Sequence, residues 1–457
     1  MDANPPVTLV WFRRDLRIAD HPALSAAAAR GHVVCLFVIE PKLLARRHHR
    51  APERLRFLRA GLEALDAELR RLGVGLVVRR GSPREVVPTV ARQAGADAVY
   101  FTRESSPYAR TRDRAVSTTL SGERIDANDF GGDLVVEPDD LPGPNGLGYR
   151  VFTPFFRAWE MQAAPTPIDP PLTLAGPTLG SDSLDPLPAG PPLMDAGPAA
   201  ARHRIGEFAR RDIGAYGEAR DQLAHDATSR ISPYLRFGMC SPGEVGRAIG
   251  LPGSLDESCA SFWRQIAWRD FYRHHLLRRP EVARMAFDPA LRGVRWERDD
   301  EGFAAWVSGE TGYPLVDAGM RQLATEGWVH NRARMVVASF LVKDLLIDWR
   351  RGETVFMQRL LDGDPANNNG GWQWTAGTGT DAAPYFRVLS PIRQAERFDP
   401  TGTYVRRYLP ELRDVPDERI HEPWKMSPEE ERKAGCRIGV DYPYPRVDHR
   451  VRRHEAI

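Results

Sequence analysis

The first 130 residues alternate continuous apolar runs with amphipathic stretches. The apolar runs, rich in β-branched side chains, are residues 7–12, 33–40, 74–81 and 97–104. Residues 21–31 predict a short helix closed by Gly31, and leucines spaced by three and four over residues 55–72 predict a longer one. Continuous apolar strands separated by helices indicate a parallel sheet covered on both faces. We therefore predict a doubly wound, Rossmann-like α/β domain over residues 1–130.

The composition changes sharply after this domain. Between residues 161 and 200, proline, glycine and alanine dominate, as in PLPAGPPLMDAGP. Proline disfavours helix and removes backbone donors, so we predict an interdomain connector over residues 131–200. Helical periodicity then predicts an all-helical domain over residues 201–457. Within that domain, DGDPANNNGGWQW (residues 362–374) follows no period and is typical of an irregular polar loop.

Charge and cysteine content narrow the class of protein. With 63 Lys and Arg against 61 Asp and Glu, the net charge is +2, so a nucleic-acid surface must be a local patch. Four cysteines without a CxxC pair argue against a disulfide framework or a zinc site, and no metal is expected. No apolar run approaches the roughly 18 residues of a membrane span. Because the N-terminal residues also lack a secretory signal, we expect a cytoplasmic protein that does not contact membranes.

Nucleotide-binding motifs of the common kinds are not found after the first strand. WFRRDLR stands there, in place of GxGxxG or GxxxxGK[ST], so a plain NAD or ATP site is not supported. Further along, CASFWRQIAWRDFYRHH places Gln265, Trp268, Arg269 and Tyr272 on one helical face. This face suits a flat, polar, π-rich ligand, although an ordinary amphipathic helix explains it at least as well.

Two other stretches combine polar side chains with a helix start. In DATSRISPYLRFG, hydroxyl groups surround Arg230 and could cradle a pyrophosphate or simply cap a helix. In GWVHNRARMVVASFL, charged residues precede an apolar helix. Asp362 or Asp364 could neutralise that charge, or solvent could. Taken alone, the tryptophans at 296, 349 and 372 are most simply core residues.

Six motifs follow one another along the chain in the order found in the DNA photolyase and cryptochrome family. The chain therefore resembles this family, in particular the microbial class I enzymes that repair cyclobutane pyrimidine dimers. The resemblance rests on WFRRDLR (11–17), TSRISPYLRFG (228–238), WRDFYRHH (268–275), TGYPLVDAGMRQL (311–323), GWVHNRARM (327–335) and DGDPANNNGGWQW (362–374). It extends from about residue 7 to past residue 410 and is interrupted by the connector.

The resemblance implies an α/β antenna domain followed by a helical domain that binds FAD. Asp362 is expected to pair with Arg334 beside the flavin ring, and Asn368 to face flavin N5, where a neutral amide forms a hydrogen bond but is a poor proton donor. The residues implied to hold FAD are Tyr216, Thr228, Ser229, Arg230, Ile231, Ser232, Gln265, Arg269, Arg334, Asp362, Gly363, Asp364 and Asn368.

The implied activity is that of a photo-lyase, the light-driven repair of pyrimidine dimers in single- or double-stranded DNA. Excited reduced FAD gives an electron to a dimer flipped out of the DNA, as photolyases do, and the electron returns after the ring opens. The residues implied to contact DNA, with Trp268 and Trp374 as an aromatic wedge, are Arg220, Trp268, Asn331, Arg332, Met335, Trp374 and Gln394. Those implied to act in repair or electron transfer are Gln265, Asn331, Asn368, Trp372, Trp349 and Trp296.

One position departs from the family pattern. Dimer photolyases normally have glutamate where this chain has Gln265, which forms hydrogen bonds but carries no charge. Glutamine there is typical of 6-4 photolyases and many cryptochromes, yet the 6-4 enzymes have a histidine pair where this chain has Asn331 and Met335. The alternative function is therefore a cryptochrome-type blue-light photoreceptor with weak or no repair activity. A flavoprotein with neither role is the third possibility.

The second chromophore is predicted from the antenna domain. His48 fits a folate site, but Tyr108 and Ala109 stand where an Asn-Glu pair is expected. SSPYARTRD (residues 105–113) is more similar to deazaflavin-binding relatives. We therefore predict 8-hydroxy-deazaflavin, with methenyltetrahydrofolate and FMN as alternatives. Nothing in the sequence indicates an oligomer, and a monomer is expected.

Overall fold

A computed structural model describes residues 5–45, 51–162, 166–225, 227–381 and 387–456. The chain forms two compact units, each made of two stretches of sequence. Unit 1 consists of Met1–Gly214 and Ser229–Pro280, and unit 2 of Ala215–Thr228 and Glu281–Ile457. Residues 215–228 thus belong to unit 2 although the residues on both sides of them belong to unit 1.

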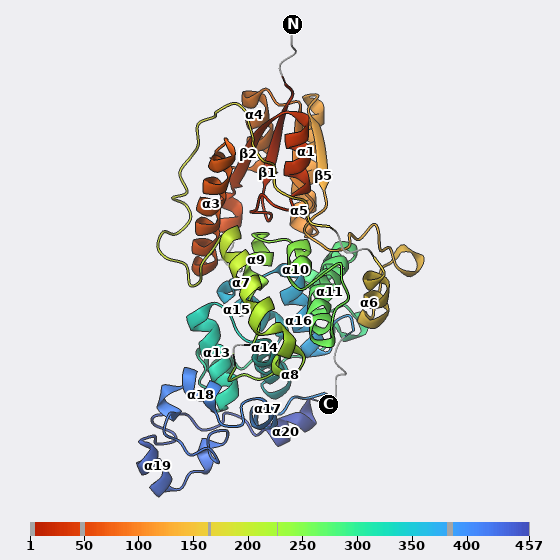
Figure 1. The fold of residues 1–457 in the computed structure, drawn as a ribbon. Helices are drawn as coiled ribbons and strands as arrows, with labels where there is room; N and C mark the ends of the chain where they lie inside the picture. The colour runs from red at the N-terminus through yellow and green to blue at the C-terminus, as the bar shows by residue number, and fades with distance from the viewer. Residues whose placement is uncertain (1–4, 46–50, 163–165, 226, 382–386, 457) are drawn as a thin grey trace. The chain divides into compact units, whose positions relative to one another are not determined.

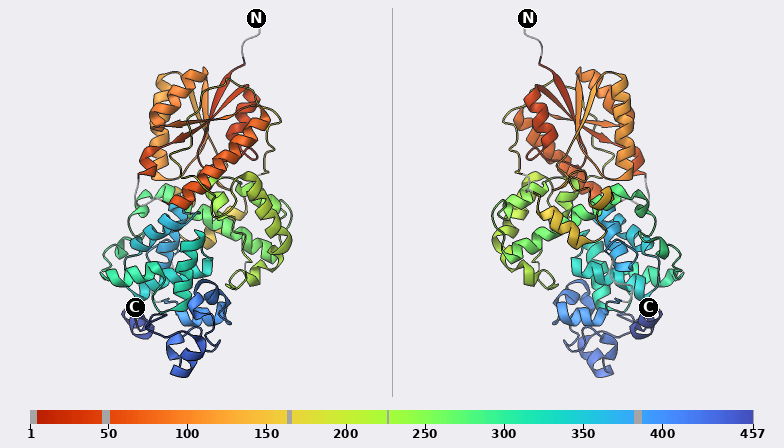
Figure 2. Two further views of the ribbon diagram at one scale, coloured as in Figure 1. Left: turned by 90° about the vertical axis from the view of Figure 1, so that its left-hand side faces the viewer. Right: turned by 90° about the vertical axis from the view of Figure 1, so that its right-hand side faces the viewer.

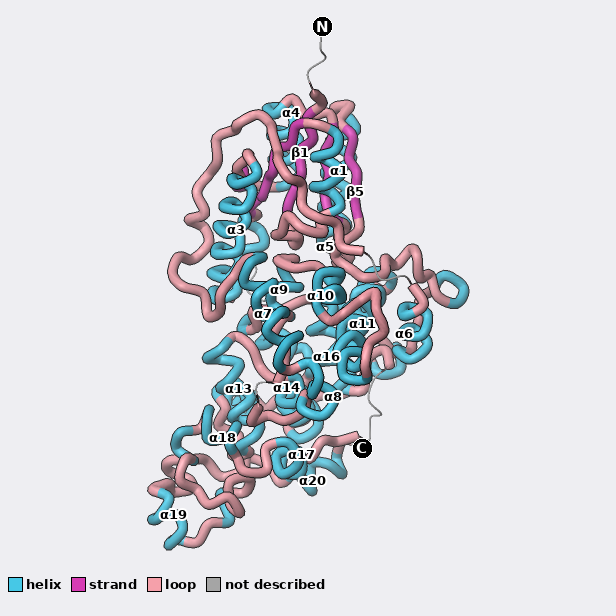
Figure 3. The backbone as a smooth tube through the Cα atoms, viewed as in Figure 1, coloured by secondary structure: helices cyan, strands magenta, loops and turns pink. Residues whose placement is uncertain are grey.

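Among the described residues, five parallel strands of unit 1 form one sheet with the order β3-β2-β1-β4-β5 (Figures 1 and 3). The strands are β1 (Val7–Phe12), β2 (His32–Ile39), β3 (Leu76–Arg80), β4 (Ala98–Thr102) and β5 (Asp126–Phe130). Helices lie on both faces of the sheet (Figure 2). They are α1 (Pro22–Arg30), α3 (Pro52–Leu72), α4 (Pro83–Ala94) and α5 (Pro107–Gly122), with the short α2 (Pro41–Leu44) after β2. The predicted doubly wound α/β fold is confirmed.

The order of the strands places the point of reversal between β1 and β4. β1 pairs with β2 on one side and with β4 on the other. The chain continues from β1 to β2 and from β4 to β5, so the connections after β1 and after β4 run in opposite directions. In such sheets ligands bind beyond the carboxyl ends of the strands, where the order reverses. The residues that follow Phe12 and Thr102 therefore occupy the ligand-binding edge of the sheet.

The proline-rich stretch is tied to the α/β part of unit 1 by backbone hydrogen bonds. Val33 donates to the carbonyl of Ala175 at 2.8 Å, Leu174 donates to that of Leu72 at 2.7 Å, and Asp182 donates to that of Val78 at 2.9 Å. Residues 166–197 therefore run along this part of the unit as an ordered extended segment. The predicted domain limits at 130 and 200 remain predictions.

The rest of unit 1 is helical. Its helices are α6 (Phe152–Glu160), α7 (Pro198–Arg211), α9 (Ser232–Phe237), α10 (Pro242–Ala248) and α11 (Glu257–Arg278). Apolar faces of α6, α7 and α11 supply buried residues such as Phe155, Phe208 and Phe271. The long α11 carries Gln265, Trp268 and Arg269, so the sequence prediction that these residues lie on a helix is confirmed.

Unit 2 is helical in its described regular elements, as predicted, apart from one isolated β-bridge between Ile438 and Tyr442. Its elements are α8 (Tyr216–Ala219), α12 (Asp300–Ser308), α13 (Pro314–Glu326), α14 (Asn331–Ser339), the π-helix η6 (Phe340–Asp344), α15 (Trp349–Arg359), α16 (Pro365–Ala376), α17 (Pro391–Phe398), α18 (Thr403–Tyr408), α19 (Pro428–Ala434) and α20 (His449–Glu455). A single apolar core runs through α13, α14, α15 and α16. Of all the described helices, none is long and apolar enough to cross a lipid bilayer.

One local prediction was wrong. DGDPANNNGGWQW is largely helical and forms α16, not an irregular loop. The Asp364 side chain accepts hydrogen bonds from the backbone of Ala366 and Asn367, and Pro365 occupies the first helical turn, where its missing N–H costs nothing. The helix lacks an apolar stripe because its amides have buried partners, so polarity here does not mean exposure to solvent.

Candidate functional site

Two carboxylates beside the start of α16 have different partners. Asp364, 5% exposed, accepts bonds from the backbone of Ala366 and Asn367, each at 3.0 Å. Asp362 instead pairs with Arg334 of α14 through two contacts, at 3.3 Å and 2.8 Å. Gly363 between them is buried and donates its N–H to the Leu360 carbonyl at 3.3 Å. The predicted ion pair between Arg334 and Asp362 is therefore present, and its guanidinium is fixed further by the Val329 carbonyl at 2.8 Å.

A chain of polar groups joins α16 to α15. Asn368 donates from Nδ2 to the carbonyl of Glu353 at 3.0 Å, and Asn369 donates from Nδ2 to the Glu353 carboxylate at 3.2 Å. One turn on, Gln373 donates to Asn369 Oδ1 at 2.9 Å and to the Val282 carbonyl at 2.9 Å. Burial raises the pKa of Glu353 to about 7, against the opposing effect of the Asn369 hydrogen bond. No motif pointed to Glu353, because its partners Asn368 and Asn369 come from another helix.

Replacing Glu353 with glutamine is expected to remove a pH dependence of stability. Because the folded-state pKa is raised above the ordinary 4.5, the neutral acid stabilises the fold at low pH, and this contribution is lost as the pH rises toward about 7. Glutamine stays neutral and still accepts from Asn369. Urea unfolding at pH 5 and pH 8 should therefore show the variant gaining about 1–2 kcal/mol on the natural protein at the higher pH. The exposed Glu301→Gln is the control, and parallel pH profiles for Glu353→Gln and the natural chain would contradict the expectation.

The predicted tryptophans of unit 2 lie in or against one core. Trp349 and Trp372 are 1% and 2% exposed, and the half-buried Trp296 packs against the same core. The Trp372 ring lies 5.0 Å from that of Phe356 and 6.0 Å from that of Trp306, between ring centres. Among the described residues, the indole N–H of Trp372 has no hydrogen-bond partner. Trp306 was not predicted, since nothing around it in the sequence marks it as a neighbour of Trp372.

A polar group on α14 and α17 includes most of the predicted DNA contacts. Arg332 bonds to Asp221 and, more loosely, to Gln394 at 3.4 Å. The exposed Asn331 places its Nδ2 3.8 Å from the sulfur of Met335. Trp374 is half-buried on α16. Of the two remaining candidates, Arg220 lies with its guanidinium 6.0 Å from the Tyr216 ring centre, and Trp268 belongs to unit 1.

The candidate residues of α11 belong to unit 1. Gln265, half-buried, donates to the Ser261 carbonyl of its own helix at 3.2 Å, which leaves its Oε1 as an acceptor. The ring of Trp268 stacks on that of Phe152, with centres 3.7 Å apart and planes 6° apart. Tyr272, 5.5 Å further along the same face, continues the aromatic group. The helical face inferred from the sequence is therefore formed, with an aromatic lining.

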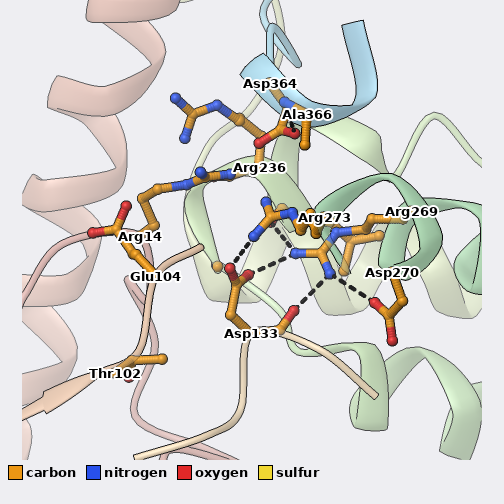
Figure 4. Close-up of polar contacts among 12 residues, drawn as sticks. Arg14, Thr102, Glu104, Asp133, Arg236, Arg269, Asp270, Arg273, Asp364 and Ala366 are labelled. Carbon is orange, nitrogen blue, oxygen red and sulfur yellow. Dashed lines mark hydrogen bonds and ion pairs between the residues drawn. The ribbon is translucent and has the colours of Figure 1, made fainter. Parts of the chain in front are cut away.

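Arg269 takes part in a buried charge cluster within unit 1 (Figure 4). It donates to the Asp133 carboxylate and to the Asp133 carbonyl, both at 2.6 Å, and Arg273 bonds to the other carboxylate oxygen of Asp133. Burial alone would raise the pKa of Asp133, but the Arg273 and Arg269 guanidiniums hold it at about 2. Asp270 accepts from the backbone of Val135 and Val136 at 2.9 Å and 3.2 Å.

The predicted phosphate-binding run is divided between the units. Tyr216 and Thr228 belong to unit 2, whereas Ser229, Arg230, Ile231 and Ser232 belong to unit 1. In unit 1 the Ser229 hydroxyl accepts from the N–H of Ile231 at 3.4 Å, and Arg230 has a left-handed backbone with φ 48°. Left-handed backbone is uncommon outside glycine, so this turn is held in an unusual geometry directly before α9.

The ligand-binding edge of the sheet carries a group of aromatic and charged side chains. The guanidinium of Arg13 lies 4.6 Å from the Trp11 ring centre, and that of Arg112 lies 4.9 Å from it. Glu104 accepts from Arg112 at 2.8 Å, and the Tyr108 hydroxyl bonds to the Glu40 carboxylate. His48 lies outside the described residues.

The chemistry of these groups fits FAD. The Arg334–Asp362 pair and the amides of α16 offer donors and acceptors to a flat heteroaromatic ring. The hydroxyls and guanidinium of residues 228–232 suit a pyrophosphate. Within the described parts of the chain, no group of three or more His, Cys, Asp or Glu side chains is placed to hold a metal ion.

Comparison with known proteins identifies the family. The family model described as "FAD binding domain of DNA photolyase" matches residues 262–457, and that described as "DNA photolyase" matches residues 8–172. A deoxyribodipyrimidine photo-lyase of Agrobacterium fabrum is 39% identical over 472 residues, with 100% of this chain and 98% of that protein covered.

Solved structures agree with this assignment. A bacterial class III photolyase from Agrobacterium tumefaciens is similar with a TM-score of 0.93 and 38% identity, covering 100% of this chain and 97% of that one. A cryptochrome from Synechocystis is similar with a TM-score of 0.91 and 31% identity, covering 100% and 99%. The chain therefore belongs to the DNA photolyase and cryptochrome family. Within it, the chain is an FAD-binding DNA-repair enzyme of the photo-lyase class.

Proposed function

We propose that this photo-lyase repairs cyclobutane pyrimidine dimers after flipping the dimer out of the DNA toward the FAD, as photolyases do. When bound in its reduced form, FAD supplies a light-excited electron to the dimer. The C5–C5′ and C6–C6′ bonds break, both C5=C6 double bonds are restored and the electron returns, so there is no net redox change. The observation that carries the proposal is the Arg334–Asp362 pair beside the Asp364-capped start of α16, in a chain of this family.

The side chains of α16 and α14 have separate tasks in this scheme. Asn368 is fixed by the Glu353 carbonyl and presents an amide, which holds a hydrogen bond but has no acidic proton to transfer. Arg334 stays charged and is balanced by Asp362, so the ring meets a neutral pair and not an isolated cation. Arg332 and Arg220 would bind phosphates, which gives affinity with little sequence preference and a marked dependence on salt.

The decisive experiment is repair in light. The protein with reduced FAD is mixed with single-stranded DNA that contains thymine dimers and is illuminated, while an identical sample stays dark. Recovery of thymine absorbance in the illuminated sample alone is the expected result. No recovery above the dark control would refute repair and leave the photoreceptor role.

The departure at Gln265 supplies a second test. Family members that repair dimers normally have glutamate there, and a charged acceptor bonds more strongly to a base N–H than an amide does. Gln265→Glu is therefore expected to raise the repair yield per absorbed photon about two- to threefold. An unchanged yield in the same illumination assay would mean that the amide does not limit repair.

The cryptochrome-type photoreceptor remains the second candidate function. Gln265 favours it, and the similarity to the Synechocystis cryptochrome is consistent with it. For a repair enzyme we expect, as from the sequence, a cytoplasmic monomer. Gel filtration of the FAD-loaded protein, with and without light, tests whether it is a monomer. A light-dependent change of oligomeric state without repair would favour the photoreceptor.

For the antenna we propose 8-hydroxy-deazaflavin at the carboxyl ends of β1 and β4. The point of reversal in the sheet and the aromatic group of Trp11 with Arg13 and Arg112, whose charges Glu104 and Asp113 balance, support a flat polar chromophore there. Separate reconstitution with the deazaflavin, with methenyltetrahydrofolate and with FMN tests the identity. Energy transfer to FAD, measured by excitation spectra, is expected for the deazaflavin at the lowest added concentration, and equal uptake of all three would argue against selectivity.

A further inference from the structure

Asp221 lies on the segment Ala215–Thr228, which unit 2 contains although the neighbouring residues in the sequence belong to unit 1. Three hydrogen bonds or ion pairs between described residues tie this segment to the rest of unit 2. Leu223 donates to the Phe398 carbonyl at 2.9 Å, Arg407 donates to the Ala224 carbonyl at 3.3 Å, and Asp221 pairs with Arg332. The segment also carries Arg220 and Tyr216. An acidic residue thus stands among side chains that the proposed function assigns to DNA and FAD.

The guanidinium of Arg332 is fixed on three sides. Its Nε lies 3.3 Å from one Asp221 oxygen and a terminal nitrogen lies 2.6 Å from the other. The second terminal nitrogen lies 3.4 Å from Gln394 Oε1, and the group sits 4.3 Å from the ring centre of Phe398. Arginine has five N–H donors. Three are used here, so among the described residues each terminal nitrogen keeps one N–H for a ligand.

A carboxylate in this place has a cost for DNA binding. It repels phosphates and offsets the charge of the arginine, so the pair attracts an arbitrary phosphate weakly. The same carboxylate holds the guanidinium in one orientation, which lowers the entropy lost when a phosphate arrives at the matching position. Only DNA that brings a phosphate to that position recovers the interaction.

We propose that Asp221 is a positioning residue that fixes the Arg332 guanidinium and so increases the preference of the protein for dimer-containing over undamaged DNA. The inference rests on the proposed function. DNA from which a dimer has been flipped has a distorted backbone, and a fixed guanidinium selects for that shape, whereas a mobile one accepts any phosphate. Asp221 thus lowers non-specific affinity and sets specificity at the same time.

The test compares Asp221→Asn with the natural protein, both loaded with FAD and kept in the dark. Fluorescence anisotropy gives the Kd for one duplex with and without a thymine dimer over a series of salt concentrations. The variant is expected to bind undamaged DNA about threefold more tightly, with a salt slope steeper by about one unit. The Kd for the undamaged duplex divided by the Kd for the dimer-containing duplex should fall about tenfold. This is the size of effect expected for one charge-assisted hydrogen bond.

Asp300→Asn is the control for the loss of one negative charge. Asp300, 86% exposed, pairs with Arg351 at 2.8 Å, and Arg351 lies 3.9 Å from the ring centre of Phe303, so the same three residue types meet at a more exposed place in the same unit. The Asp300→Asn variant loses the same charge as Asp221→Asn and should leave the Kd ratio and the salt slope unchanged.

A second variant, Arg332→Lys, keeps the positive charge at position 332 but loses the planar fork of the guanidinium. Although Asp221 is unchanged in this variant, the preference for dimer-containing DNA is expected to be lost.

The possible results distinguish failure of the proposed repair function from failure of the proposed role of Asp221. If the natural protein shows no preference for the dimer duplex, the proposed function fails and this inference with it. If the natural protein shows the preference and Asp221→Asn retains it within twofold, the inference alone is overturned. The same holds if Asp300→Asn changes the ratio as much as Asp221→Asn does.

Discussion

Asp133→Ala is expected to lower the free energy of unfolding by about 3–5 kcal/mol. Arg269 and Arg273, 9% and 1% exposed, would both lose the carboxylate that they share. Removing one partner of a buried ion pair leaves a charge that has been taken out of water without compensation. Asp270 compensates only in part: its Oδ1 already lies 3.5 Å from Nη1 of Arg269, and its Oδ2 accepts from Trp159 and from two backbone N–H groups.

The natural protein should show the same cluster in its acid unfolding. The pKa of Asp133 in the folded state is about 2, below its ordinary value of 3.8. For a lowered pKa, the stabilisation is fully present above about pH 4 and is lost as the pH falls toward 2. Urea unfolding followed by circular dichroism, at pH 7 and at pH 3, measures both effects. Asp129→Ala serves as control, since its pair with Arg103 is 44% and 37% exposed and should contribute less than about 1 kcal/mol. Equal losses for the two variants would contradict the assignment of Asp133.

Gly352→Ala is expected to destabilise unit 2 by about 3 kcal/mol and to slow photoreduction of bound FAD. A Cβ at position 352 of α15 would overlap the Trp372 ring and would lie 2.6 Å from a methyl group of Leu341. A buried indole cannot yield by that amount within a close-packed core, so Trp372 must move. The family resemblance implies that Trp372 takes part in electron transfer to the flavin, so its displacement is expected to slow that transfer.

Gly371→Ala in α16 is the matched control for this substitution. Its Cβ would meet nothing within 4 Å, and Gly371 is exposed. Alanine should therefore stabilise this helix by about 0.5–1 kcal/mol and leave Trp372 in place. Thermal unfolding and the rate of flavin photoreduction in the presence of a reductant measure the two expectations. A Gly352→Ala protein that is as stable and as fast as Gly371→Ala would show that the close contact has no consequence.

The fold could be predicted wherever a pattern of side chains reflected one buried face. The four apolar strands and the leucine-spaced helix α3 were found in this way, because burial alone determines their sequence pattern. β5 was missed since its sequence, DANDF, is polar and lies at the edge of the sheet. α16 was missed for a related reason, because amides that bond to one another inside the protein have no apolar period.

The sequence motifs were enough to predict several residues of the candidate site. They were not enough to predict the residues that these side chains contact. Arg334, Asp362 and Asn368 came from motifs, and the ion pair between the first two is present. Glu353, Asp221 and Trp306 did not, because each acts on a residue far away in the sequence: Asp221 and Arg332 are 111 positions apart. Such contacts depend on the tertiary fold, which no local pattern records. The role of each residue in catalysis is a proposal that the repair and binding experiments address.

The interleaving of the two units has a consequence for synthesis on the ribosome. Asp133 is made 140 residues before Arg273. At roughly 5–20 residues per second, a delay on the order of 10 seconds separates the acid from its second buried partner. During that time, residues 215–228 of the other unit emerge as well. Unit 1 therefore cannot finish folding as an N-terminal domain usually does, and the nascent chain must hold an unneutralised carboxylate in solvent until α11 arrives.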